Sequence, residues 1–339
     1  MRPLPQGGRA AGRPLRWAGR VSVAAVLCVL AVQCVRPALW DDHASTVFAA
    51  GLAAGVPHGA VDHLVPAWCR AHAADRGRQA LLLLAYAGAA AAAFACALWA
   101  PAPALCAFLA LSALHFGRGE THANALRAGG TRPPGPALCA LAYGAVVTVL
   151  PLARHPHAVR GLVAALTPGA PWLLAAPVTA AATALTAAAA VTACALLLRH
   201  RRHHDAAELL LLAVLFWTVH PLVAFAAYFA AWHSVRHIAR LLLADPANRP
   251  ALCAGHLGPP LRRFHRRAAL PTAVVLAASV AAARLGEPHR HALAAAGVAV
   301  LAALTLPHHL VVALLDRHEA RGPAPGDRAA RPAGTSTRA

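Results

Sequence analysis

The chain of 339 residues contains no lysine and a single methionine, and only 13% of its residues are charged. A soluble domain carries about 25% charged residues, so this scarcity points to a membrane protein. Because lysine is missing, the formal net charge of +19 comes from arginine. The arginines gather in short stretches between apolar runs, as the positive-inside rule predicts, and not on one face of a soluble domain. No nucleic-acid partner is therefore expected.

The chain also lacks any CxxC pair, and its eight cysteines are scattered, mostly within apolar runs. This excludes a disulfide framework and a thiolate zinc site. The cysteines are best explained as small apolar packing residues. No clear A-x-A cleavage site follows the first apolar run, which favours a retained membrane span over a signal peptide.

Long apolar runs dominate the rest of the chain. A run needs roughly 17–25 residues to cross a bilayer as a helix. The sequence predicts an all-α, polytopic membrane helical bundle of about 8–10 transmembrane helices, with Pro101, Pro103, Pro221 and Pro271 at junctions. The ten runs lie at 21–39, 44–66, 79–99, 102–117, 134–153, 172–198, 206–220, 222–243, 268–285 and 291–315.

The basic stretches between these runs fall on alternate sides of the predicted bundle, with 154–160 as the exception. This pattern predicts a multi-pass protein of the cell membrane with both termini in the cytoplasm. Residues 1–20 are expected to form a basic cytoplasmic arm and residues 21–316 the transmembrane domain. Residues 317–339, rich in Pro, Ala, Gly and Arg, are expected to form a disordered cytoplasmic tail.

Four short motifs interrupt the apolar runs, and each contains histidine. All four lie on spans predicted to run from outside to inside. Their histidines fall about 11 to 17 residues from the outer ends, which at 1.5 Å per residue is roughly 16–25 Å deep. These side chains therefore share one layer of the membrane. The motifs are GVPHGAVDH (Gly55–His63), SALHFGRGE (Ser112–Glu120), WHSVRH (Trp232–His237) and LPHH (Leu306–His309).

A layer of buried histidines is typical of a metal site. Neutral imidazole suits Fe, Zn, Cu and Ni, and histidines at i and i+4, such as His233 and His237, lie on one helix face. Asp62 and Glu120 are predicted to accept hydrogen bonds from neighbouring histidines. Each motif alone is also explained by ordinary packing, and Arg236 by extension to the membrane surface.

The ordered set of motifs resembles the Brp/Blh family of microbial membrane β-carotene 15,15′-dioxygenases. The matching elements are P-H-G-x-x-D, H-F-G, H-S-x-R-H and a late P-H, in that order from residue 55 to residue 309. The resemblance implies a non-haem Fe(II) enzyme that splits the central double bond of β-carotene with O₂ into two molecules of retinal. The iron ligands that it implies are His58, His115, His233 and His237.

Some roles remain open under this resemblance. His63 follows the core of its motif, and His308 is expected to line the site with or without binding the ion. His309 would point about 100° away from His308 on a helix. Phe116, together with other aromatic residues of these motifs (Tyr228, Phe229 and Trp232), lies either along a polyene tunnel or in ordinary helix packing. The implied partners are β-carotene, O₂, the lipid bilayer and a retinal-binding rhodopsin that accepts the product.

Three other functions are compatible with a histidine-rich membrane protein. A membrane di-iron desaturase or hydroxylase needs about eight histidines in HxxxH and HxxHH boxes, and only one HxxxH pair here lies in a span. A metal or proton transporter would use the histidines and Asp62 as a relay, but it commonly shows inverted repeats and broken helices. A bis-histidine haem protein is the third alternative.

Overall fold

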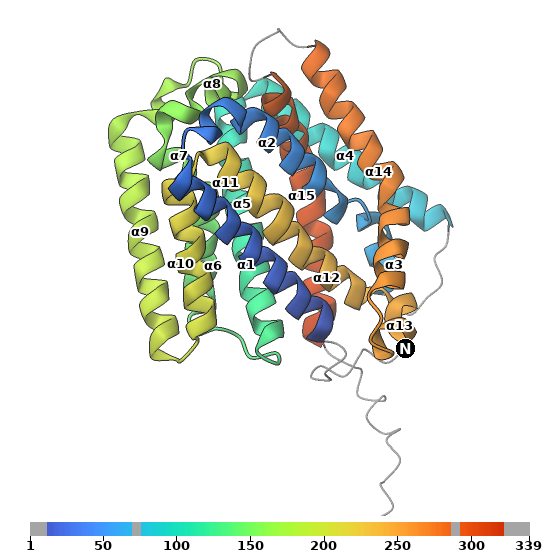
Figure 1. The fold of residues 1–339 in the computed structure, drawn as a ribbon. Coiled ribbons are helices and arrows are strands. Elements are labelled where there is room, and N and C mark those ends of the chain that lie inside the picture. Colours follow the sequence, from blue (N-terminus) through green and yellow to red (C-terminus); the bar gives the residue numbers. More distant parts are fainter. Residues whose placement is uncertain (1–11, 70–75, 286–291, 322–339) are drawn as a thin grey trace, which may run out of the picture.

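The structure, a computed structural model, describes residues 12–69, 76–285 and 292–321 (Figure 1). In these ranges every regular element is helical. The longer helices are α1 (Gly12–Val35), α2 (Leu39–Gly55), α4 (Arg76–Trp99), α5 (Pro101–Arg127), α6 (Pro136–Thr148), α8 (Pro156–Leu166), α9 (Ala176–Arg199), α10 (His203–Thr218), α12 (Ser234–Ala244), α14 (Gly258–Leu285) and α15 (Ala292–Arg321). Short helical segments connect them: η1 (Val56–His58), η2 (Asp62–Leu64), α3 (Val65–Trp68), α7 (Leu150–Arg154), η3 (Pro171–Leu174), α11 (Pro221–Ala227), η4 (Tyr228–His233), η5 (Pro246–Asn248) and α13 (Arg249–Cys253).

Six of the described helical stretches are long and apolar enough to cross a membrane. Much of their exposed surface is apolar, as required of a helix surface that faces lipid instead of water. In α4, for example, Leu81 and Leu84 are exposed, and Leu185 and Val191 play the same part in α9. The prediction of an all-α polytopic membrane bundle is therefore confirmed. The six stretches are Gly12–Val35, Asp42–Trp68, Gly77–Trp99, Ala176–Arg199, Gly258–Leu285 and Ala292–Glu319.

The other four predicted spans lie in helices that are shorter or more polar. The run at 102–117 is the first part of α5, whose second part carries Arg118, Glu120 and Arg127. The run at 134–153 is divided between α6 and α7, and the run at 206–220 corresponds to α10. These helices supply much of the buried core: Tyr143 of α6 is fully buried. In the view shown, α9 forms one edge of the bundle and α10 lies next to it (Figure 1).

Three predicted features differ from the structure. The last part of the predicted N-terminal arm is helical, since α1 begins at Gly12, and the first part of the predicted disordered tail, residues 317–321, is the end of α15. Residues 1–11 and 322–339 lie outside the described residues. Pro271 was predicted at a junction but lies inside α14, which begins thirteen residues earlier at Gly258. Neighbouring helices in a membrane protein make an internal proline tolerable, and prolines 259 and 260 occupy the first turn, where a missing N–H costs little.

The predicted span at 222–243 forms one continuous helical rod with an irregular middle. It begins as α11, passes through η4 and continues as α12. The η4 segment is π-helical, with a wider turn than an α-helix. π-Helical turns are rare in proteins, and those that occur are often found at functional sites. This rod, α5 and α15 meet in the middle of the bundle (Figure 1).

Candidate metal centre

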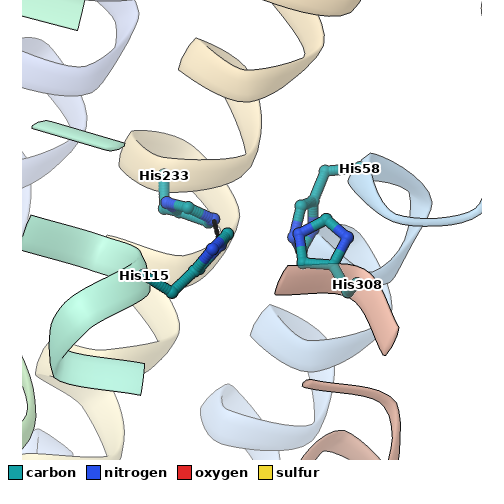
Figure 2. A group of neighbouring side chains, drawn as sticks. All are labelled: His58, His115, His233 and His308. Atoms are coloured by element: carbon teal, nitrogen blue, oxygen red, sulfur yellow. Dashed lines mark hydrogen bonds between the residues drawn. The ribbon is translucent and has the colours of Figure 1, made fainter. Parts of the chain in front are cut away.

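Four buried histidines from four different elements converge in the interior of the bundle. One ring nitrogen of each lies within 4.8 Å of the others. Figure 2 shows the rings of His115 and His233 on one side and those of His58 and His308 on the other, facing each other. Residues 250 positions apart in the sequence thus form one compact group of nitrogen donors.

His58 is held at the end of a broken helix. Helix α2 ends at Gly55, two residues before Pro57, which lacks the N–H that a regular helix would use. The Nδ1 atom of His58 lies 2.7 Å from the Gly55 carbonyl oxygen, to which it donates a hydrogen bond. The Ser234 hydroxyl lies 3.2 Å from the same nitrogen. With Nδ1 occupied, the Nε2 lone pair of His58 is left to bind an ion.

His115 and His233 face each other from α5 and η4. Their Nε2 atoms lie 3.2 Å apart, and both side chains are buried. Among the described residues, the Nδ1 atom of His115 has no hydrogen-bond partner. The two Nε2 atoms are close enough to share one N–H as a hydrogen bond, and in place of that proton one cation could bind both lone pairs.

His308 is oriented by a carboxylate from the first motif. Its Nδ1 atom lies 2.7 Å from Oδ2 of Asp62, and the Tyr86 hydroxyl donates to the same oxygen over 3.0 Å. The Nε2 atom of His308 is buried without a partner. Metal-binding histidines commonly donate their second N–H to a carboxylate in this way. Asp62 therefore accepts a hydrogen bond from a histidine, which is the kind of contact that the sequence predicts. The donor is His308 and not the neighbouring His58.

The fourth predicted ligand, His237, lies beside this group. Its ring centroid is 5.6 Å from that of His58 and 5.5 Å from that of His308, and it stacks on His233 at 6.1 Å. Its Nε2 atom is buried without a partner. Of the predicted ligands, the structure therefore brings His58, His115 and His233 into the convergent group, with His237 adjoining it.

Two further histidines of the motifs lie outside the convergent group. His63 is half-buried on η2, and His309 is half-buried on α15. The ring of His309 does reach His115, with centroids 5.8 Å apart. These placements agree with the lesser roles that the sequence suggests for both.

Glu120 and Arg236 form a buried ion pair, which the sequence does not predict. Glu120 was expected to accept a hydrogen bond from a histidine, but its oxygens accept from Arg236 and from two aromatic residues. Arg236 also pairs with Glu208 at 2.9 Å and lies over the Trp232 ring. It is 8% exposed and therefore does not extend to the membrane surface. A buried charge of this kind needs such partners.

The aromatic residues of the motifs divide into two sets. Phe116 contacts the His233 ring, with centroids 4.8 Å apart, and Phe229 contacts His58 at 5.3 Å. Tyr228 and Trp232 instead donate hydrogen bonds to the Glu120 carboxylate. These hydrogen bonds, together with ordinary helix packing, explain why the two side chains are buried. A cavity of about 30 Å³ borders His233, and it has room for a water molecule but not for a polyene.

These donors fit a transition-metal ion. The convergent atoms are all imidazole nitrogens, which suit Fe, Zn, Cu or Ni, whereas Mg²⁺ and Ca²⁺ prefer oxygen. A carboxylate fixes one ring, and a backbone carbonyl fixes another, as is usual around bound metals. The buried Nε2 atom of His308, which has no hydrogen-bond partner among the described residues, is a second indication. The geometry therefore supports the metal site that the sequence predicts.

Comparisons with known proteins agree with this picture. A family model described as beta-carotene 15,15′-dioxygenase matches residues 49–316. The chain is 33% identical over 294 residues to a probable beta-carotene 15,15′-dioxygenase Blh from Halobacterium salinarum, covering 78% of this chain and 81% of that protein. No solved structure matches. All four histidine motifs lie within the matched residues, and the chain belongs to the β-carotene 15,15′-dioxygenase family.

Proposed function

We propose that this protein cleaves the central 15,15′ double bond of β-carotene with O₂ and releases two molecules of all-trans-retinal. One C=C bond and one O=O bond break, and two C=O bonds form, so each retinal receives one oxygen atom. The observation that carries the proposal is the convergence of four buried histidines inside a chain that matches this family over residues 49–316.

The proposed cofactor is Fe(II), held by His58, His115, His233 and His308. His237 remains in the proposed ligand set, because its Nε2 atom is buried without a partner next to the same rings. Bound Fe(II) would supply an open coordination position at which O₂ is activated. The histidine ligands are neutral and leave the ion its charge. Within the part of the chain that the structure describes, no carboxylate belongs to the convergent group, which sets it apart from the common site of two histidines and one carboxylate.

The surroundings of the histidines suit a hydrocarbon substrate. β-Carotene dissolves in the bilayer, and the bundle presents an apolar outer surface to it. Close to the site, Phe116 and Phe229 pack against the histidine rings and keep them out of water. These side chains would bind the polyene by apolar contact and exclude water from the reacting double bond.

The arrangement of the helix ends supports the proposed orientation in the cell membrane. The start of α1 and the end of α15 lie on the same side of the bundle, together with the connections from α5 to α6 and from α9 to α10 (Figure 1). Both connections are basic. The positive-inside rule places this side in the cytoplasm. A rhodopsin in the same membrane is the proposed acceptor of retinal.

Rival functions find less support. A di-iron site would need about eight histidines, and five buried histidines are gathered in the described residues of this site. The hydrogen bond from His308 to Asp62 joins α15 to η2 and holds the imidazole ring in one orientation, which suits a fixed metal site better than a transport relay. The family match covers the whole histidine set and favours carotenoid cleavage over transport.

Expression of the full chain in cells that accumulate β-carotene tests the proposal. We expect loss of the orange colour and one-to-two conversion of β-carotene to retinal, measured by chromatography of extracted pigments. Cells that express His233→Ala serve as the control. Persistence of β-carotene with iron and oxygen supplied, in cells where the protein is present in the membrane, would contradict the proposal. Two unequal fragments, one longer and one shorter than retinal, would show cleavage at another bond.

A further inference from the structure

Glu120 is a buried carboxylate that binds three residues of one helical rod. Its Oε1 atom accepts a hydrogen bond from the Tyr228 hydroxyl at 3.1 Å. Its Oε2 atom accepts from Nε1 of Trp232 at 2.9 Å and from a guanidinium nitrogen of Arg236 at 3.0 Å. These three donors follow one another at intervals of four residues and so form one face of the rod. Both oxygens of Glu120 are occupied, and the side chain is 1% exposed.

This carboxylate joins the helices that carry two of the proposed ligands. Glu120 lies five residues after His115 on α5, and Trp232 directly precedes His233. The Nε2 atoms of the two histidines are 3.2 Å apart. The backbone of α5 also packs on the second ring: a Cβ at Gly119 would lie 3.8 Å from Cε1 of His233. The distance between α5 and η4 therefore sets the distance between the ligands.

The same carboxylate holds the π-helical turn in place. Tyr228 is the first residue of η4, and Trp232 is the next to last. A π-helical turn is rare and is maintained only where surrounding interactions favour it over a regular α-helix. Conversion of η4 to an α-helix would rotate His233 relative to Glu120 on α5. Hydrogen bonds at both ends of the turn oppose that change.

We propose that Glu120 is a positioning residue of the metal site: it fixes the π-helical turn against α5 and so sets the separation of His115 and His233. The inference rests on the metal site of the proposed function. Glu120 touches neither the ion nor the substrate in this assignment, and it acts through the helices that it joins. Its charge is balanced by Arg236.

Glu208 provides a matched comparison, because it pairs with the same arginine. Its two oxygens lie 3.1 and 2.9 Å from the two terminal nitrogens of Arg236. Its other hydrogen bonds go to Arg127. Loss of Glu208 therefore removes a buried carboxylate from Arg236 without touching Tyr228 or Trp232. A merely electrostatic role for Glu120 predicts equal effects of the two losses, whereas a positioning role predicts unequal effects at the metal site.

The test uses the purified full chain in detergent, freed of metal and titrated with Co²⁺. The visible absorption of bound Co²⁺ reports ligand geometry independently of catalysis. We expect Glu120→Gln to change that spectrum and to weaken Co²⁺ binding at least about tenfold, the lower limit for residues that orient metal ligands. The Gln amide has one acceptor oxygen and no charge, so it cannot accept from all three donors: its NH₂ group faces either Tyr228 or the pair Trp232 and Arg236. Glu208→Gln should keep the wild-type spectrum and bind Co²⁺ within about threefold of wild type, although we expect this variant to unfold at a lower temperature than the wild-type chain.

Three outcomes overturn the inference: a wild-type spectrum and affinity in Glu120→Gln, equal losses in the two variants, or no Co²⁺ binding by the wild-type chain. If Glu120→Gln does not fold, Trp232→Phe removes one of the three donors and should shift the spectrum in a smaller degree; an unchanged spectrum then contradicts the role. A chain that makes no retinal but shows the Glu120-dependent spectrum retains the positioning role and loses the proposed function. Retinal formation with an unaltered Glu120→Gln spectrum shows the reverse.

Discussion

Two buried carboxylates approach the histidine group from different sides and act in different ways. Asp62 accepts from His308 and from Tyr86 through one oxygen, and its Oδ1 atom has no hydrogen-bond partner. Glu120 uses both oxygens and accepts from no histidine. Asp62 therefore accepts a hydrogen bond from a proposed ligand, His308, whereas Glu120 is hydrogen-bonded to the helical rod that carries His233.

The difference shows two levels at which a fold controls a metal site. A hydrogen bond to an imidazole N–H fixes the tautomer and the orientation of a single ring. A carboxylate between helices fixes the backbone from which two rings project. The Asp62 contact connects η2 to α15, elements far apart in the sequence, through a single bond. The contacts of Glu120 spread over two turns of one rod.

Removal of a ligand should exceed the effect of either carboxylate, and His233→Ala provides this upper limit. His233 lies next to both His115 and His58, at ring-centroid distances of 5.0 Å each. We expect His233→Ala to bind no Co²⁺ tightly and to form no detectable retinal, measured by Co²⁺ titration and by pigment extraction. His204→Ala, at an exposed position of α10, is the control and should match wild type. Retinal formation by His233→Ala would remove this residue from the ligand set.

The fourth ligand position separates the sequence prediction from the geometry. The motif resemblance implies His237, and the convergent group contains His308. Because each has a buried Nε2 atom without a partner, we expect both His237→Ala and His308→Ala to weaken Co²⁺ binding by more than about tenfold. Whichever variant keeps the wild-type affinity and spectrum is not a ligand. Asp62 orients a metal ligand only if His308→Ala is a variant with weakened Co²⁺ binding.

Asp62→Asn tests the direct form of support. The amide oxygen can still accept from His308, but the negative charge that increases the basicity of the ring is lost. We expect Co²⁺ binding to weaken by about 10- to 100-fold, with retinal formation reduced in parallel. Asp316→Asn is a matched control on the helix of His308, since Asp316 pairs with Arg240 and with none of the histidines of the group. Equal losses in the two variants would mean that Asp62 acts on helix packing and not on His308.

The sequence predicts the histidine layer well because depth along a helix follows from residue counting. His58, His115 and His233 could be placed at one level from their positions in apolar runs. Rotation about each helix axis is set by packing, which counting does not give. For this reason the sequence does not predict that His308 belongs to the convergent group or that His237 lies beside it.

The buried charge network was missed for a related reason. Glu208 lies near the start of the predicted run at 206–220, directly after a basic loop, and the sequence indicates no partner for it; α10 packs against α1, α6 and α9 and buries it. Ion pairs with Arg236, 28 positions later, and with Arg127 make that burial stable. The π-helical turn at Tyr228–His233 leaves no mark in the hydrophobic pattern either, because it changes the register by a single residue.

Tyr86→Phe should have the smallest effect and gives the sharpest test of the direct mechanism. It removes the hydroxyl that donates to Asp62 over 3.0 Å, while the bond from Asp62 to His308 stays. We expect Co²⁺ affinity to fall by less than about tenfold, with a small loss of thermal stability, since a hydrogen bond to a charged group contributes about 1.5–3 kcal/mol. The combined variant Asp62→Asn/Tyr86→Phe should bind Co²⁺ no more weakly than Asp62→Asn alone, because the tyrosine acts on the site through the aspartate. Additive losses would instead show that Tyr86 supports the site by a route of its own, and the single line from Tyr86 through Asp62 to His308 would have to be abandoned.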